Sequence, residues 1–185
     1  MTLLVGLSGK AGAGKDSLAR FLVQDHGFVR IALADPVREA LYRLDPLIGE
    51  GSTCLTDAVD SFGWDRIKRN PEVRGLMQRM GTEVGREMFG AEFWTDLAVE
   101  RIAYALHHRR NVVVTDVRFV DEAERLRNIG GQIVRIERPD LEPVNDHPSE
   151  TDLDEYLADY RLVNRAYAEL PRKAAELVED LQEGK

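Results

Sequence analysis

A glycine-rich stretch near the N-terminus, Gly6 to Ser17, contains the residue types that bind a phosphate group. Its part from Gly9 to Lys15 fits the pattern G-x-x-x-x-G-K of a phosphate-binding loop, or P-loop. In such a loop, consecutive backbone N–H groups and the N-terminus of the following helix converge on one point. The alternative, a turn that merely joins a strand to a helix, does not explain a lysine at the helix start. The pattern therefore predicts a site for nucleotide phosphates, made by Gly12, Ala13, Gly14, Lys15, Asp16 and Ser17.

Three residues at the end of this loop could take part in phosphoryl transfer. Lys15 is expected to reach the β- and γ-phosphates and to spread their charge. Ser17 supplies a hydroxyl for Mg²⁺ one position later than in the general pattern, because Asp16 stands where Ser or Thr is usual. Asp16 allows two interpretations. It is either a carboxylate that favours the positive end of the helix dipole, or a group that orients an acceptor phosphate or a metal-bound water.

The second candidate ligand for Mg²⁺ is Asp116, which follows the apolar run from Val112 to Val114. A carboxylate after a buried strand suits a hard cation that keeps several waters, so we expect Asp116 to hold Mg²⁺ through water. The alternative is a carboxylate that caps a helix or a loop.

Four arginines lie at the ends of predicted elements, where a cluster around phosphates could form: Arg38, Arg86, Arg118 and Arg138. Transfer between two nucleotides brings several anionic groups together, and arginine suits bidentate contact with phosphate. The alternative for each arginine is a structural ion pair at the surface. Trp94 is expected in the core, with the wall of a base pocket as its alternative role.

Composition limits the class of protein. The chain has 185 residues, 43% of them apolar, which suits one domain over residues 1–185 with a sizeable core. Its net charge of −8 argues against a general binder of polyanions such as polymeric nucleic acid. Cys54 is the single cysteine, which excludes a disulfide framework within the chain. No apolar stretch is long enough to span a bilayer, so we expect a soluble, cytoplasmic protein without a membrane partner.

Strand-like segments alternate with helical ones along the whole chain. The expected strands are residues 3–7, 28–33, 111–116, 132–136 and 160–163, and helices are expected from 18, 35, 70, 93, 121 and 170 onward. This order predicts an α/β fold of three layers, with a mostly parallel five-stranded sheet and helices on both faces. The carboxyl ends of the strands then share one edge, which brings the P-loop, Asp116, Arg118 and Arg138 together.

Several local features are predicted from turn and capping residues. Asp35-Pro36 and Asn70-Pro71 each combine a capping side chain with a proline that suits the first helical turn. Gly81-Thr82 is expected to interrupt the second of these helices, with Thr82 as the cap of a new short turn. Residues 45–69 lack clear periodicity and are expected to form an irregular excursion rather than a second domain. Residues 139–155 are polar and proline-rich and are expected to form a short lid-like loop.

The motifs together resemble the phage-type deoxynucleoside monophosphate kinases, a branch of the P-loop nucleoside monophosphate kinase group. The resemblance begins with Gly14-Lys15-Asp16-Ser17 and Ala34-Asp35-Pro36, and its most specific parts are Leu76 to Arg86 and Thr115 to Phe119 with Glu122. It continues, in the family's order, through Phe93-Trp94, Arg138-Pro139, His147-Pro148-Ser149-Glu150 and Asp159 to Asn164.

The resemblance implies a P-loop NTPase fold and transfer of the γ-phosphoryl group of ATP to a deoxynucleoside 5'-monophosphate, with Mg²⁺. It implies catalytic roles for Lys15, Asp16, Arg118 and Arg138, and ATP binding by the P-loop. The residues implied on the monophosphate side are Lys10, Asp35, Arg38, Gln78, Thr82, Arg86, Trp94 and Glu150. Transfer is expected to be in-line and to depend on positioning and charge, because the acceptor phosphate is already ionised.

Two departures from the family pattern bear on fine geometry: Val120-Asp121 replaces a common Pro-Asn, and Arg38 replaces a common lysine. Two other functions stay open. One is a P-loop kinase for another small acceptor, such as dephospho-coenzyme A or phosphomevalonate, and the other is a regulatory NTP-binding module. The sequence leaves the preferred base and the oligomeric state open, a homodimer included.

Overall fold

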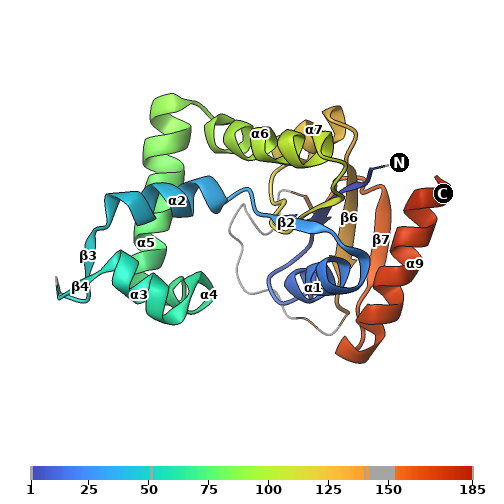
Figure 1. The fold of residues 1–185 in the computed structure, drawn as a ribbon, viewed down its shortest axis with the longest axis horizontal. Helices are drawn as coiled ribbons and strands as arrows, with labels where there is room; N and C mark the ends of the chain where they lie inside the picture. Colours follow the sequence, from blue (N-terminus) through green and yellow to red (C-terminus); the bar gives the residue numbers. More distant parts are fainter. Residues whose placement is uncertain (1, 51, 140, 142–152, 185) are drawn as a thin grey trace. The chain divides into compact units, whose positions relative to one another are not determined.

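The computed structural model describes residues 2–50, 52–139, 141 and 153–184 (Figure 1). Contacts divide the chain into two compact units. Unit 1 comprises Met1–Leu33 and Val99–Lys185, and unit 2 comprises Ala34–Ala98. The expectation of one kinase domain over residues 1–185 therefore stays a prediction.

Unit 1 is built on a five-stranded parallel sheet with the strand order β2-β5-β1-β6-β7. Its strands are β1 (Leu4–Ser8), β2 (Val29–Ile31), β5 (Val112–Val114), β6 (Gln132–Glu137) and β7 (Tyr160–Val163). All residues of β1 and β5 are buried, as expected of central parallel strands. The predicted fold class is confirmed, although β2 and β5 are shorter than the segments predicted for them.

Helices pack against both faces of the sheet in unit 1. Val5 and Leu7 of β1 join the core with Leu22 of α1 (Lys15–His26) and Leu177 of α9 (Leu170–Glu183). Gly6 faces the other side, where a Cβ atom would lie 3.0 Å from Leu126 of α7 (Val120–Asn128). Because successive side chains of a strand point to opposite faces, β1 alone fixes α1 and α9 against one face and α7 against the other.

Unit 2 is mainly helical and has a hydrophobic core of its own. Its elements are α2 (Asp35–Leu44), the hairpin β3 (Leu47–Ile48) and β4 (Thr53–Cys54), α3 (Leu55–Phe62), α4 (Trp64–Ile67), α5 (Pro71–Arg79) and the π-helix η1 (Met80–Phe89). α6 (Phe93–His107) begins in unit 2 and ends in unit 1.

The expectation of an irregular excursion over residues 45–69 is wrong, because this segment forms the hairpin and two helices. Leu55, Ala58 and Val59 lie at helical spacing on α3 and are buried in the core of unit 2 together with Leu41 and Val73. Each element is only two to eight residues long. Periodicity is difficult to recognise over so few residues.

Two of the predicted helix boundaries are also wrong. Asp35 is the first residue of α2, Ala34 occupies the capping position, and the Asp35 carboxylate accepts a hydrogen bond from Arg38 instead. Gly81-Thr82 does not interrupt the helix, because α5 continues directly into η1. Thr82 lies inside η1 and is not the N-cap of a helix. The cap at Asn70 is confirmed, since its Oδ1 accepts a hydrogen bond from the Glu72 N–H at 2.9 Å.

The π-helix explains why Gly81 does not act as a helix breaker. The indole Nε1 of Trp94 donates a hydrogen bond to the Gly81 carbonyl oxygen at 3.1 Å. A Cβ atom on Gly85 would lie 1.7 Å from that nitrogen, so only glycine leaves room for the ring. Gly81 therefore lies inside a continuous helical segment, where its carbonyl oxygen accepts the indole N–H.

Candidate functional site

The P-loop joins β1 to α1 in a conformation that depends on glycine. Gly9 has a φ of +129°, and a Cβ atom there would lie 2.3 Å from the carbonyl oxygen of Ile136 on β6. Gly14, the residue before α1, has a φ of +109°. Between them, the N–H of Ala13 donates to the carbonyl of Lys10 at 3.1 Å. The loop therefore lies tightly against the carboxyl end of the sheet, as the sequence predicts.

Lys15 is the first residue of α1, and its ammonium group bends back over the loop. Its Nζ donates hydrogen bonds to the carbonyl oxygens of Gly9 and of Lys10, the latter at 2.9 Å. Asp16 is exposed and Ser17 is half-buried in the first turn of the same helix. A positive charge, a hydroxyl and the helix N-terminus thus lie at one end of α1, which is the composition that an anionic phosphate with a hard cation requires.

Asp116 follows β5, the neighbour of β1 in the sheet. Its Oδ1 accepts a hydrogen bond from the Leu33 N–H at 2.7 Å, which fixes the carboxylate at the carboxyl edge of the sheet. Asp116 therefore holds the loop after β2, as in the alternative considered for it. This contact is compatible with metal binding, because a carboxylate has two oxygens and several lone pairs.

Glu122 gives the loop after β5 its shape. Its Oε2 accepts hydrogen bonds from the N–H groups of Arg118 (2.8 Å) and Phe119 (3.1 Å). Burial is the main cause that raises the pKa of Glu122 to about 7. The charges of Asp116 and Asp121 also raise it, while the two N–H donors lower it. The sequence resemblance includes Glu122, but its altered pKa depends on burial and could not be predicted.

We expect the variant Glu122→Gln to be more stable than the wild type at pH 8 and to lose most of this advantage at pH 5. Between the ordinary value of 4.5 and about 7, the folded protein binds more protons than the unfolded chain, so the contribution of Glu122 to stability falls as the pH rises. Glutamine retains an oxygen for both N–H donors and has no charge to bury. Thermal unfolding from pH 5 to 8.5 measures the effect. Glu179→Gln, at an exposed position on α9, serves as the control, and a difference between Glu122→Gln and wild type that does not change with pH would contradict the assignment.

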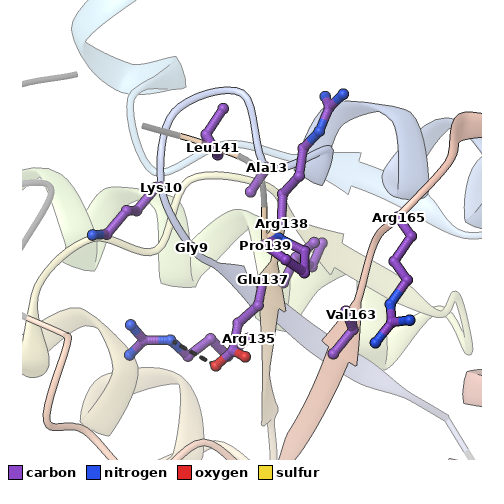
Figure 2. A pocket seen from close by; sticks show the side chains of 11 residues that line it. Gly9, Lys10, Ala13, Arg135, Glu137, Arg138, Pro139, Leu141, Val163 and Arg165 are labelled. Carbon is purple, nitrogen blue, oxygen red and sulfur yellow. Dashed lines mark ion pairs between the residues drawn. The ribbon is translucent and has the colours of Figure 1, made fainter. Parts of the chain in front are cut away.

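A cavity of about 420 Å³ lies beside the P-loop in unit 1 (Figure 2). Its apolar lining includes Ala13, Ile136, Pro139, Leu141 and Val163, and its charged lining includes Lys10, Arg135, Glu137, Arg138 and Arg165. The cavity has the size that is typical of sites for small molecules, and its lining combines apolar side chains with charged ones.

The arginines around this cavity differ in their surroundings. Arg135 is tied to its neighbours: its guanidinium lies 2.7 Å from a carboxylate oxygen of Asp154 and 3.6 Å from Glu137. Arg138 and Arg165 follow β6 and β7 and are exposed. Within the part of the chain that the structure describes, no hydrogen bond or ion pair holds either of these two guanidinium groups. The cavity therefore has one arginine that is part of its wall and two that could contact a ligand.

The structure thus brings Arg138 to the P-loop cavity, as predicted, and adds two arginines that the sequence did not single out. Arg165 comes two residues after β7 and could have been found by the rule that placed Arg138, since the carboxyl ends of parallel strands share an edge. Arg135 lies inside β6. The sequence alone does not show whether a side chain in a strand lines a cavity or only packs within the fold. Arg118 is exposed after β5 and does not line the cavity.

Candidates for the acceptor side lie in unit 2, apart from Lys10 and Glu150. The guanidinium of Arg38 and the carboxylate of Asp35 form an ion pair of 2.9 Å, and the Arg38 side chain is 15% exposed. Its buried Nε has no hydrogen-bond partner among the described residues. The remaining candidates are Gln78 and Thr82, which are exposed, and Arg86 and Trp94, which are half-buried.

The structure joins only some of these candidates directly. α2, which carries Asp35 and Arg38, packs against α5 and η1, the elements of Gln78, Thr82 and Arg86. Trp94 contacts η1 through Gly81 and Gly85. His147, Glu150 and most of the predicted lid lie outside the described residues.

Two other features are absent from the described residues, a cluster of metal-binding side chains and a membrane-spanning helix. Within the described part of the chain, no cluster of three or more His, Cys, Asp or Glu side chains could hold a metal ion. No helix in that part is both long enough and apolar enough to cross a membrane.

Comparisons with known proteins agree with this geometry. A family model described as deoxynucleotide monophosphate kinase matches residues 50–171. A protein of Acanthamoeba polyphaga mimivirus, provisionally described as such a kinase, is 29% identical over 167 residues, which cover 82% of each chain. The deoxynucleotide monophosphate kinase of Escherichia phage RB69 is 33% identical over 82 residues, or 44% of this chain and 34% of its own. In fold, the chain is similar to the dephospho-CoA kinase of Campylobacter jejuni, with a TM-score of 0.56 at 14% identity, over 100% of this chain and 99% of that one.

Proposed function

Because the chain belongs to the deoxynucleotide monophosphate kinase family, we propose that it transfers the γ-phosphoryl group of ATP to a deoxynucleoside 5'-monophosphate. The products are ADP and a deoxynucleoside diphosphate. The observation that carries the proposal is the P-loop, whose Gly9 fits against β6 and whose Lys15 lies over the loop, beside a cavity. In this proposal, units 1 and 2 belong to one kinase domain.

The cavity in unit 1 is proposed as the donor site. ATP phosphates on the P-loop would direct the rest of the nucleotide toward the apolar lining formed by Pro139, Leu141 and Val163. Arg138 and Arg165 are exposed at its rim, and guanidinium groups can bind phosphates or stack on a base. The donor site is therefore proposed to comprise the P-loop, the end of β6 and the end of β7.

The polar groups of unit 2 are proposed to bind the monophosphate acceptor. The supporting observation is Arg38, a largely buried cation that is paired with Asp35 and keeps one N–H unpartnered among the described residues. A buried donor without a partner is costly, and a bound phosphate oxygen would satisfy it. Trp94, fixed by Gly81 and Gly85, is proposed as a wall for the base.

Ser17 and Asp116 are proposed to hold Mg²⁺ together with phosphate oxygens and water. The test of fit is the chemistry of the donor set: a hydroxyl at the start of α1 and a carboxylate after the neighbouring strand are oxygen ligands of the kind that Mg²⁺ prefers. When bound, Mg²⁺ supplies positive charge to the phosphates of the donor.

The reaction requires little proton transfer from the protein, because an ionised acceptor phosphate is already a nucleophile. The proposed roles of the chain are therefore positioning and charge stabilisation. Lys15 binds the transferred group, and Arg118 and Arg138 add positive charge at the same edge of the sheet. Asp16 is proposed to orient the acceptor or a water, and its exposed position leaves it accessible to either.

A panel of acceptors tests this function directly. The purified protein, ATP and Mg²⁺ are incubated with each common deoxy- and ribonucleoside monophosphate and with dephospho-coenzyme A, while ADP and the phosphorylated product are measured separately. We expect ADP and diphosphate in equal amounts with at least one deoxynucleoside monophosphate. Folded protein that gives no product with any of them would refute the proposal.

The same panel distinguishes the two other functions. Product with dephospho-coenzyme A alone would indicate a kinase for a different acceptor. ADP release that is independent of every acceptor would indicate a regulatory NTPase. The similarity to dephospho-CoA kinase concerns the fold alone at 14% identity and does not favour that substrate.

A further inference from the structure

Asn164 joins three segments at the donor site, although it does not line the cavity. It follows β7 directly and is 5% exposed. Its backbone N–H donates to the carbonyl of Glu137 at the end of β6 (2.7 Å), and its Nδ2 donates to the carbonyl of Ala13 in the P-loop (2.8 Å). The ends of two strands are thereby linked to the loop through a single side chain.

The end of β7 is itself held in place. Nζ of Lys173 on α9 donates a hydrogen bond to the carbonyl of Val163, the residue before Asn164, and also lies 3.0 Å from Oε2 of Glu169. Val163 is also paired with Glu137 in the register of β6 and β7. The backbone at Asn164 is therefore held firmly. A side chain can fix the conformation of another segment only if its own backbone is fixed.

The contact determines the direction of one peptide group. A trans peptide is planar, so the carbonyl of Ala13 and the N–H of Gly14 point in opposite directions. Because Nδ2 of Asn164 holds the Ala13 carbonyl, the Gly14 N–H faces away from Asn164. A Cβ atom on Gly14 would lie 2.4 Å from Nδ2, so the amide packs directly against this glycine.

The choice of asparagine has a cost that packing alone does not explain. Its Oδ1 is buried and has no hydrogen-bond partner among the described residues. An apolar side chain of similar shape would avoid this unsatisfied acceptor. Only the donor end of the amide makes a side-chain hydrogen bond, and its partner is the P-loop carbonyl. The distinctive contribution of Asn164 is therefore its hydrogen-bond donor, which binds the Ala13 carbonyl.

We propose that Asn164 is a positioning residue of the P-loop, which holds the Ala13 carbonyl so that the Gly14 N–H points to the phosphates of the bound nucleotide. The inference deepens the proposed function, on which it rests. It assigns to the segment after β7 a role in phosphate binding that acts through the backbone of the loop, without contact between Asn164 and the ligand.

Asn164→Asp tests this role through its pH dependence. The substitution retains the shape of the side chain but replaces the donor with an oxygen, which repels the Ala13 carbonyl when the carboxylate is ionised. At pH 8 we expect ADP, titrated by calorimetry, to bind about 10-fold more weakly than to the wild type, which corresponds to one lost hydrogen bond. Burial at this position disfavours the ionised form of a carboxyl group, so as the pH falls the protonated group donates again and the affinity relative to wild type recovers. In turnover assays the KM for ATP rises more than kcat falls.

Asn164→Leu removes the donor at every pH and is expected to bind ADP weakly throughout. Asn164→Ala, which also has no donor, provides the same comparison if the leucine variant does not fold. Asn128→Asp, at an exposed position on α7, controls for the added charge. A folded leucine or alanine variant with wild-type affinity for ADP, or an aspartate variant with wild-type affinity at pH 8, would overturn the proposal. Wild type that binds ADP but phosphorylates no acceptor would refute the proposed function while leaving the role of Asn164 testable.

Discussion

Lys15→Met is expected to lower kcat with the best acceptor at least about 100-fold, the size of effect that follows the loss of one group that stabilises developing charge. Methionine retains most of the length of the side chain but cannot neutralise the transferred phosphoryl group. Coupled measurement of ADP formation gives kcat, and calorimetry gives the affinity for ADP. The hydrogen bonds from Nζ to Gly9 and Lys10 are lost as well, so a small decrease in the unfolding temperature should accompany the loss of activity.

Arg20→Met is the control for this prediction. Arg20 is exposed on α1, so the variant removes a cation from the same helix without changing the P-loop. It should retain wild-type kcat. If Lys15→Met also retained wild-type turnover, Lys15 would have no part in the mechanism.

Gly85→Ala should disrupt unit 2 and raise the KM for the monophosphate at least about 10-fold. A Cβ atom at this position would lie 1.7 Å from the indole nitrogen of Trp94, so the ring must move and lose its hydrogen bond to Gly81. Overpacking of this kind typically costs about 1–3 kcal/mol of stability. Thermal unfolding measures this cost, and steady-state kinetics with the acceptor varied measures KM.

Gly75→Ala is the matched control, because Gly75 is also helical and, among the described residues outside its own helical turn, no atom lies within 4 Å of its added Cβ. Alanine should leave activity unchanged there and should stabilise α5 by up to about 1 kcal/mol. The affinity of Gly85→Ala for ADP should stay near that of wild type, since the proposed donor site lies in unit 1. A wild-type KM for the monophosphate in Gly85→Ala would remove Trp94 from the proposed acceptor site.

The sequence predicts the sheet and the P-loop well because both have strong local signals. β1 and β5 are short runs of apolar residues, and the loop requires glycine at fixed positions such as Gly9, where β6 leaves no room for a side chain. Parallel topology then places Asp116 and Arg138 at the same edge without further information. These predictions depend on patterns that lie within a few residues of each other.

The features that the sequence does not predict depend on contacts between distant segments. The hairpin and short helices of residues 45–69 are specified by burial against α2 and α5 rather than by their own periodicity. The π-helix depends on Trp94, which lies beyond its C-terminal end, while Gly81 taken alone suggests a break. The link between Asn164 and Ala13 spans 151 positions and becomes visible only when β7 lies beside β6.

The π-helix also has a consequence for how this chain tolerates deletions. Each π turn contains about one residue more than an α turn, since its hydrogen bonds join residue i to i+5. Removing about one residue for each π turn between Met80 and Phe89 would let the segment relax into the α form, which is far more common. Such a shortened chain could gain helical stability while rotating Gly81 and Gly85 away from Trp94. The additional residues of the π form therefore lower the intrinsic stability of this helix, and they keep Gly81 and Gly85 in contact with the ring of Trp94.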